Sequence, residues 1–348
     1  MLRVGIDARK LLDDRRGIGR YVRALLSSWN RRASDRVALT LLVPDLFPSF
    51  VANRLAAEIG FKLPVARRRG RYDVVWYPWN GMTWVSSDRK VATVHDCWPF
   101  ASPANDLAIR HNEQTPFRTT AAHADLIIAD SAFGKSEIVR RLGVDPAKIE
   151  VVNLGVDPRP AGIARRGTSV QKPERPYILF VGEAEERKDL GTLLIAMGLL
   201  PPELRDRFEL VVVGKGQPRK EDAVPRNATV TFKGEVSDAQ LAEYYSAASL
   251  FVFPSRYEGF GLPVLEAMSF RVPVVASDAA SVPEACGGAA QLFPVSNASA
   301  LAATIARVLK TPALLARLRD AGRTRASAMT WDLCADRTLA ILERMARL

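Results

Sequence analysis

Residues 253–277, FPSRYEGFGLPVLEAMSFRVPVVAS, follow the pattern of a strand end, a glycine-containing loop, a short helix and the next strand. The apolar run that ends at Phe253 suits a buried strand, and Gly259 and Gly261 interrupt it. Pro263 fits the first turn of a helix, because its missing N–H would have no intrahelical partner there. We therefore expect unpaired backbone N–H groups at a positive helix end, which is a natural cradle for phosphate.

Two carboxylates flank this cradle. Glu258 stands on the loop, and Glu266 follows eight positions later, about one turn into the helix. Carboxylates repel phosphate, but they accept hydrogen bonds from hydroxyl groups on either side of a diphosphate. A nucleotide sugar has this arrangement, with ribose at one end and hexose at the other. A structural strand–loop–helix corner with two solvated glutamates is the alternative explanation of the same spacing.

Strand-like apolar runs alternate with helical stretches along nearly the whole chain. In the first half we predict strands over residues 2–7, 37–43, 73–77, 90–95, 125–129 and 149–152, and helices over 18–29, 50–59, 107–122 and 132–142. In the second half we predict strands over 177–181, 209–213, 229–233, 250–253, 273–276 and 291–293, and helices over 189–200, 238–248, 262–270, 298–309, 312–328 and 331–348. Short, mostly non-alternating apolar runs are typical of strands covered on both faces. The predicted fold class is therefore α/β, with doubly wound parallel sheets.

Residues 155–176 are rich in glycine, proline and charge and show no periodicity, so they are the best linker candidate. We predict a Rossmann-like domain over residues 1–160, a linker over 161–176 and a second Rossmann-like domain over 177–330. Two such domains are expected to face each other across a cleft, and ligands in these sheets bind at the carboxyl ends of the strands.

Length and composition exclude several classes of protein. The chain has 348 residues, of which 48% are apolar, which is enough for about two domains with ordinary cores. It contains no run of about 18 apolar residues that could span a membrane, and its start, MLRVGIDARK, lacks the apolar core of a signal peptide. The three cysteines, Cys97, Cys286 and Cys334, do not form a zinc or disulfide framework, so we expect a cytoplasmic setting.

The net charge of +11 is unevenly distributed, because residues 1–160 carry 25 Lys and Arg against 17 Asp and Glu. Arginines cluster within residues 15–23, at 31–32 and within 67–71. A solvated basic surface explains these clusters, and so does peripheral contact with an anionic membrane on its inner face. No nucleic-acid motif and no interleaving of aromatic and basic residues is present, so we expect no nucleic acid partner.

Three further groups fall at predicted strand ends or helix starts. His95-Asp96 ends a strand of the first half, Gly17 opens the first long helix, and Arg187-Lys188 follows the first strand of the second half. A basic pair facing a helix-end cradle would neutralise a diphosphate and stabilise it as a leaving group. Each group also has an ordinary structural explanation: a histidine that caps a strand end, a surface loop and a surface ion pair.

The sequence favours a reaction without a metal or a cofactor. The three histidines, at positions 95, 111 and 123, form no obvious ligand cluster, and Asp13-Asp14 lack the alternate spacing of a metal-binding pair. Val22 stands where a dinucleotide fingerprint has its third glycine, so a nicotinamide dehydrogenase is disfavoured.

Taken together, these residues resemble glycosyltransferase family 4, whose members are retaining enzymes of the GT-B fold. The segment from Glu258 to Glu266 is similar to the family's E-x7-E motif, and it continues into PVVAS at 273–277 and the acid Glu284. FKGEVS at 232–237 resembles the strand and loop that hold the base. The opening GIDAR, GIGRY and VHD stretches resemble a branch found in O-antigen and exopolysaccharide assembly, many of whose members are mannosyltransferases.

The resemblance implies a role for each matching residue. Contacts to the nucleotide part of the donor are implied for Gly17, Val236, Phe260, Gly261, Leu262 and Glu266. Catalytic roles at the donor sugar and the diphosphate are implied for His95, Arg187, Lys188 and Glu258. We assign acceptor contacts to Tyr21 and Asp96. The first domain would bind the acceptor and the second the donor, and the helix 331–348 would cross back to the first domain.

The implied activity is transfer of a hexose, with mannose from GDP-mannose as the best guess, to a glycan or lipid-linked saccharide, retaining the α configuration. Two positions depart from the family pattern: Arg271 replaces a usual glycine, and Glu183 stands where many relatives have arginine or another residue. These departures keep a catalytically weak or degenerate GT-B scaffold open as an alternative. A nucleotide-sugar epimerase or hydrolase on the same fold is a second alternative.

Overall fold

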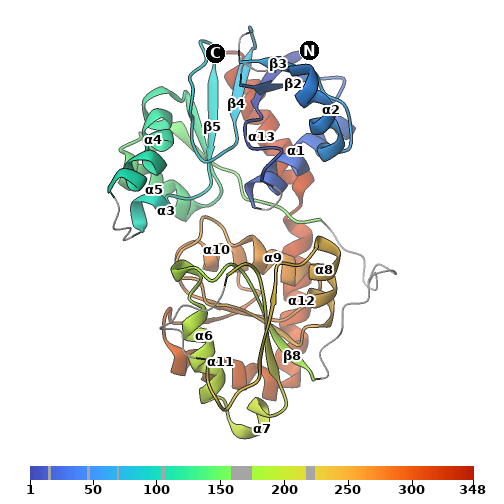
Figure 1. Ribbon diagram of the computed structural model, residues 1–348, viewed down its shortest axis with the longest axis vertical. Coiled ribbons are helices and arrows are strands. Elements are labelled where there is room, and N and C mark those ends of the chain that lie inside the picture. Colours follow the sequence, from blue (N-terminus) through green and yellow to red (C-terminus); the bar gives the residue numbers. More distant parts are fainter. Residues whose placement is uncertain (15–16, 45–47, 69, 103–106, 158–174, 217–223) are drawn as a thin grey trace. The chain divides into compact units, whose positions relative to one another are not determined.

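The computed structural model describes residues 1–14, 17–44, 48–68, 70–102, 107–157, 175–216 and 224–348. The chain forms two compact units (Figure 1), which are considered one at a time. Unit 1 comprises Met1–Gly155 together with Trp331–Leu348, and unit 2 comprises Val156–Thr330. Most of the predicted linker 161–176 lies outside the described residues.

Unit 1 is built on a parallel sheet whose described strands follow the order β3-β2-β1-β4-β5-β6-β7. The strands are β1 (Leu2–Asp7), β2 (Val37–Val43), β3 (Val65–Arg67), β4 (Val74–Tyr77), β5 (Lys90–Val94), β6 (Leu126–Ala129) and β7 (Ile149–Val151). Most are short apolar runs, because a strand buried on both faces has no side that must be polar.

Helices cover both faces of this sheet. They are α1 (Ile18–Arg32), α2 (Pro48–Ile59), α3 (Trp98–Ala101), α4 (Leu107–His123), α5 (Ala132–Leu142) and α13 (Trp331–Met345). Figure 1 shows α1 and α13 on one side of the sheet and α4 and α5 on the other. Neighbouring residues of β4 point to opposite faces: Trp76 packs against Trp29 of α1 with ring centroids 5.2 Å apart, whereas Tyr77 belongs to the core cluster that contains Phe117 of α4.

The C-terminal helix α13 is an integral part of unit 1. The indole Nε1 of Trp29 donates a hydrogen bond of 2.9 Å to the carbonyl oxygen of Ala335. The hydroxyl of Ser28 donates to Asp332 at 2.7 Å. Leu342 is fully buried. The last helix in the sequence therefore completes the hydrophobic core of the unit that contains the first strand.

Unit 2 repeats this architecture with a parallel sheet in the order β10-β9-β8-β11-β12-β13. Its strands are β8 (Tyr177–Val181), β9 (Glu209–Val213), β10 (Val230–Gly234), β11 (Leu250–Phe253), β12 (Val274–Ser277) and β13 (Gln291–Phe293). Its helices are α6 (Leu190–Leu199), α7 (Pro202–Arg205), α8 (Asp238–Ala247), α9 (Leu262–Ser269), α10 (Val282–Cys286), α11 (Ala298–Lys310) and α12 (Pro312–Ala328).

The core of unit 2 has two layers around its sheet. On one face Ile178 of β8, Leu194 of α6 and Ile305 of α11 are fully buried in one cluster. Helix α9 packs on α12, where Gly322 lies against Met268. The predicted fold class, two Rossmann-like α/β domains with parallel sheets, is confirmed.

Candidate active site

The order of strands reverses once in each sheet, and predicted site residues lie at both places. In unit 1 the reversal lies between β1 and β4, and in unit 2 between β8 and β11. Loops that leave the carboxyl ends of such strands turn away from each other, so ligands bind there. The loop after β8 leads to Arg187 and Lys188, and the loop after β11 carries Glu258.

Glu258 and the basic pair form one ionic cluster in unit 2. Lys188 Nζ lies 2.6 Å from Glu258 Oε1, and Arg187 Nη1 lies 3.3 Å from Glu258 Oε2. Lys188 is 8% exposed and Glu258 is 7% exposed. Burial alone would raise the pKa of Glu258, but the neighbouring Lys188 and Arg187 outweigh it and lower that pKa. The carboxylate is therefore ionised at neutral pH and bonded to both cations.

The predicted phosphate cradle follows two residues later. Gly261 precedes α9 with a φ of +106°, a conformation that glycine adopts without steric cost. In the described part of the chain, the N–H groups of Phe260, Gly261 and Leu262 have no acceptor. Pro263 lies in the first turn of the helix, as predicted. These donors and the positive end of the helix dipole form a local site for negative charge.

Glu266, the second carboxylate, is held from a neighbouring helix. The hydroxyl of Tyr245 donates to Glu266 Oε2 at 3.2 Å, and the Tyr245 ring stacks on Phe270 with centroids 5.4 Å apart. Helix α8, which carries Tyr245, begins with a capping box at Ser237, directly after Val236. The predicted ribose contact and the predicted base contact are therefore linked through a single helix.

His95 follows β5 directly, and its ring is engaged on both sides within unit 1. Nδ1 lies 2.7 Å from Asp130 Oδ2, and Nε2 lies 2.9 Å from the carbonyl oxygen of Pro78. Because a carbonyl oxygen can only accept, Nε2 carries a proton and donates it. Burial alone would lower the pKa of His95, but Asp130 and the Pro78 carbonyl raise it. A contact of this ring with the donor sugar stays a prediction, and it requires one of these two bonds to be exchanged.

The predicted acceptor residues lie close to His95. Tyr21 is 2% exposed, and its ring packs edge-on against the His95 ring with centroids 5.0 Å apart. Asp96 Oδ1 accepts a hydrogen bond of 3.0 Å from the N–H of Trp98 at the start of α3. The structure shows Tyr21 supporting His95 and Asp96 shaping the next loop, while direct acceptor contacts stay predictions.

Gly17, another predicted donor contact, precedes α1 with a φ of +56°. A Cβ atom at this position would meet no other atom within 4 Å. The open space is compatible with a nearby ligand, and the positive φ accounts for glycine by itself.

Asn80 is a supporting residue that the sequence analysis missed. Its side-chain oxygen accepts from the N–H groups of His95 at 2.9 Å and Asp96 at 3.4 Å, so it joins the loops after β4 and β5. Its φ is +56°, a conformation that asparagine tolerates better than most residues. The dipeptide Asn80-Gly81 is a turn signal and could have indicated this position.

The two departures from the family pattern have different surroundings. Arg271 follows α9 with a φ of +61°, and its guanidinium pairs with Asp320 of α12 at 3.3 Å. It therefore sits at the opposite end of α9 from the cradle. Glu183 follows β8, and partial burial and the neighbouring Glu185 raise its pKa.

Some of the predicted basic clusters are bonded internally. Arg31 lies 3.0 Å from Asp332, and Arg32 lies 2.9 Å from Asp336, both on α13. Arg23 donates to the carbonyl oxygens of Asp14 and Leu11 and pairs with Glu58. Positions 15–16 lie outside the described residues.

Among the described residues, no three His, Cys, Asp or Glu side chains come together where they could hold a metal ion. In the same part of the chain, no single helix is long and apolar enough to cross a membrane. The helices α11 and α12, which meet at 97°, pass that test as a pair on length and composition alone.

Two doubly wound parallel units, with a glutamate loop and a basic pair at the strand reversal of the second, define the GT-B class of glycosyltransferases. Residues 15–159 match the family described as Glycosyltransferase Family 4, and residues 165–325 match Glycosyl transferases group 1. O-antigen chain mannosyltransferase B of Escherichia coli is 33% identical over 267 residues, which cover 72% of this chain and 69% of that protein. The chain belongs to glycosyltransferase family 4.

Other relatives are similar to the chain in sequence, and solved structures are similar to it in fold. A D-inositol 3-phosphate glycosyltransferase of Streptomyces scabiei is 30% identical over 308 residues, covering 79% of this chain and 68% of that protein. Sucrose-phosphate synthase of Thermosynechococcus elongatus shares the fold with a TM-score of 0.69 and 21% identity over 99% of both chains. Anabaena HepE in complex with UDP-glucose has a TM-score of 0.71 and 15% identity over the full length of both chains.

Proposed function

We propose that this glycosyltransferase transfers mannose from GDP-mannose to a glycan or lipid-linked saccharide, retaining the α configuration and requiring no metal. The observation that carries the proposal is the ionic cluster of Lys188, Arg187 and Glu258 next to the unpaired amides before α9. A metal ion in other enzymes would neutralise the diphosphate, and here two cations and a helix end can supply that positive charge.

The cluster also suggests how the donor would bind. A diphosphate that enters the cradle competes with Glu258 for the N–H donors of Lys188 and Arg187. Once released, the Glu258 carboxylate can accept hydrogen bonds from hydroxyl groups of the hexose. Glu266 would accept from the ribose, and the backbone at Val236 would contact the base. Binding of the diphosphate would thereby prepare the contact with the sugar.

The α configuration of the sugar is retained if the acceptor attacks the anomeric carbon from the side that the diphosphate leaves. The bond between the anomeric carbon and the β-phosphate oxygen breaks, and its electron pair stays on the diphosphate. The acceptor oxygen bonds to the same face of the carbon, and its proton passes to the departing phosphate oxygen. Lys188, Arg187 and the amides would stabilise the charge that develops there. No side chain then has to act as a dedicated base.

The choice of mannose rests on the relatives. The Escherichia coli relative is named as an O-antigen chain mannosyltransferase, and a Mycolicibacterium hassiacum relative, 32% identical over 232 residues, is named as an α-(1→4)-mannosyltransferase. HepE, by contrast, was solved with UDP-glucose. GDP and UDP are therefore the two nucleotides that the first experiment must separate.

The experiment is a thermal-shift titration of the purified protein with GDP, UDP, ADP and dTDP, with Glu266→Ala as the control. A ligand at about 100 times its dissociation constant stabilises the native state by about 2.7 kcal/mol. We expect a shift with GDP that is lost in the variant. A shift with UDP alone would replace the donor in this proposal, and no shift with any nucleotide would favour the degenerate scaffold.

Product analysis separates transfer from the other reactions. A transferase releases the nucleoside diphosphate fastest when a saccharide acceptor is present and forms a larger glycan. An epimerase would interconvert the donor sugars, and a hydrolase would release free hexose without any acceptor.

The predicted contact of unit 1 with an anionic membrane is a separate proposal. Arg31 and Arg32 are bonded to α13, whereas Arg67 and Arg71 are exposed. Sedimentation with liposomes tests it: equal binding to neutral and anionic vesicles would remove the proposal.

A further inference from the structure

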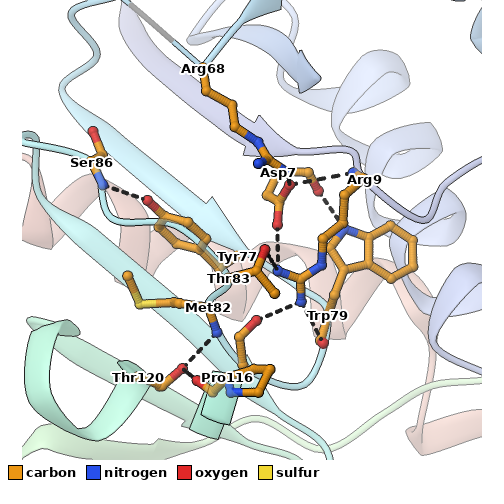
Figure 2. A network of polar contacts seen from close by, with 11 residues as sticks. Asp7, Arg9, Arg68, Tyr77, Trp79, Met82, Thr83, Ser86, Pro116 and Thr120 are labelled. Atoms are coloured by element: carbon orange, nitrogen blue, oxygen red, sulfur yellow. Dashed lines mark hydrogen bonds and ion pairs between the residues drawn. The ribbon is translucent and has the colours of Figure 1, made fainter. Parts of the chain in front are cut away.

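A second charged cluster lies at the strand reversal of unit 1 (Figure 2), and the proposed chemistry does not use it. Asp7 ends β1 and is fully buried. Two guanidinium groups face its carboxylate: Arg9 Nη1 lies 3.2 Å from Oδ2, and Arg68 Nη2 lies 3.7 Å from Oδ1. Two cations against one carboxylate leave an excess of positive charge at the carboxyl ends of the strands, where ligands bind in such sheets.

Arg9 is used to shape the loop after β4. Its Nη1 donates to the hydroxyl of Thr83 at 2.6 Å, and its Nη2 donates to the carbonyl oxygens of Trp79 at 3.1 Å and Gly81 at 2.7 Å. Its side chain is only 10% exposed. Figure 2 shows this guanidinium enclosed by the loop. Arg9 is therefore a structural residue with little capacity for another ligand.

Arg68 differs from Arg9 in its hydrogen bonding and in its exposure. Within the described residues it makes no hydrogen bond, and its approach to Asp7 at 3.7 Å is longer than one. Its guanidinium lies over the ring of Trp84, with the central carbon 5.2 Å from the ring centroid, and its side chain is 23% exposed. Trp84 is supported in turn by Tyr77, with ring centroids 5.0 Å apart.

We propose that Arg68 binds an oxyanion, a phosphate or carboxylate group carried by the acceptor. The inference rests on the proposed function, because it assigns a contact to the acceptor of that reaction. A guanidinium already placed over an indole ring loses little freedom on binding, and its parallel N–H donors match two oxygens of such a group. Asp7, buried behind it, orients the guanidinium, and Arg9 offsets the charge of that carboxylate.

The test uses the position of the tryptophans. All six lie in unit 1, at positions 29, 76, 79, 84, 98 and 331. Tryptophan fluorescence therefore reports on unit 1, where Trp84 lies beside Arg68. The purified protein is titrated with mannose 6-phosphate, with glucuronate and with uncharged mannose. The first two probes distinguish a phosphate from a carboxylate, and mannose shows what the sugar contributes alone.

The matched variants are Arg68→Gln and Arg67→Gln, which remove the same charge from adjacent positions. We expect Arg68→Gln to weaken binding of the preferred anion by about tenfold or more, as loss of hydrogen bonds to a charged group should. Arg67→Gln should change it by no more than about twofold, since Arg67 is exposed. If Arg68→Gln fails to fold, Arg68→Lys is used instead. It keeps a cation opposite Asp7 but loses the parallel N–H donors of the guanidinium, so it should also bind the anion more weakly.

Three results would overturn the inference: equal weakening by both glutamine variants, no weakening by Arg68→Lys and Arg68→Gln, or binding of mannose as tight as that of the anions. These outcomes are separate from the proposed function, because no donor or turnover is involved. Transfer that depends on Lys188, together with anion binding that ignores Arg68, would remove this inference alone. Binding that depends on Arg68 without transfer from any nucleotide sugar would remove the proposed function alone.

Discussion

Both units place charged groups after the carboxyl ends of their strands, but they bond them differently. In unit 2, Lys188 and Arg187 share the carboxylate of Glu258, and an incoming phosphate can take over the same donors. In unit 1, both ring nitrogens of His95 are bonded to Asp130 and Pro78, which a ligand would have to displace. We infer that the cluster of unit 2 is suited to exchange partners and that of unit 1 to hold loops in place.

The largest effect is expected for His95→Leu, which leaves the buried Asp130 carboxyl without its histidine partner. Removing one partner of a buried pair costs about 3–5 kcal/mol, because the remaining charge is uncompensated. Urea unfolding followed by tryptophan fluorescence measures the loss, since all six tryptophans belong to unit 1. Adding Asp130→Asn to the variant should restore part of the stability. A loss below about 1 kcal/mol, as for an exposed pair, would contradict the view that this pair holds unit 1 together.

The same pair predicts a pH dependence. Although burial opposes it, the Asp130 carboxylate raises the pKa of His95, so the native state binds the proton more tightly than the unfolded chain does. This contribution to stability is complete below the ordinary histidine pKa of about 6.5 and is lost as the pH rises through the raised value. The double variant His95→Leu with Asp130→Asn has neither titrating group. We expect wild-type unit 1 to lose stability relative to it above about pH 6.5, and parallel curves would refute this.

Lys188→Ala tests the cluster of unit 2. It should reduce transfer without changing the stability of unit 1. Loss of one donor to a developing negative charge lowers turnover by about 100- to 1,000-fold. The measurement is kcat/KM with the nucleotide sugar that the thermal-shift titration identifies. Lys310→Ala is the matched control, because that lysine pairs with Glu203 on the surface of the same unit. Near wild-type turnover in Lys188→Ala would remove the assignment of the diphosphate site.

A stability measurement must accompany that prediction, because Glu258 is buried beside the lost lysine. Arg187 still faces the carboxylate at 3.3 Å, so some compensation remains. The double variant Lys188→Ala with Glu258→Gln removes the unpaired charge and should recover stability without recovering transfer. Recovery of both would mean that Lys188 acts only through the fold.

The sequence alone predicts most of the architecture, for a physical reason that single strands illustrate. The predicted strand 2–7 matches β1, and 250–253 matches β11, which is a continuous apolar run bounded by breaks. The sequence analysis missed β3. This strand is three residues long, lies at the sheet edge against β2 and is followed by an arginine cluster. Such a strand is fixed by its pairing partner and not by its own pattern.

The candidate site was predicted in part. His95 could be placed at a strand end from sequence, but its partners lie 17 and 35 positions away on other strand ends. Only the order of strands in the sheet brings them together. Lys188 and Glu258, 70 positions apart, were expected to face one ligand, and the structure adds that they bond to each other. The cluster of Asp7 and Arg68 was missed, because its two elements pair only through β2.

Helix α13 gives a test of moderate size within unit 1. Leu342 is fully buried, so Leu342→Ala should cost about 3 kcal/mol through lost burial and the cavity left behind. Asp336, also on α13, makes an exposed ion pair with Arg32, and Asp336→Ala should cost less than about 1 kcal/mol. Both losses are read from tryptophan fluorescence. Equal costs would mean that the ionic contacts, and not the apolar ones, attach this helix to unit 1.

The smallest effect is expected at Arg271, where the backbone has a φ of +61°. A side chain in this left-handed conformation costs about 1–2 kcal/mol, which glycine avoids, although glycine gives back part of the gain through a more flexible unfolded chain. Arg271→Gly should therefore be more stable than Arg271→Ala by about 1 kcal/mol, since both lose the exposed pair with Asp320. Hydrogen exchange of peptides from α9 and β12 measures this difference in unit 2, which has no tryptophan among its residues. If the alanine variant equals the glycine variant, the backbone there carries no strain. If the glycine variant alone raises transfer, Arg271 affects activity through the backbone at the end of α9. The backbone of unit 2, as well as its ionic cluster, would then influence activity.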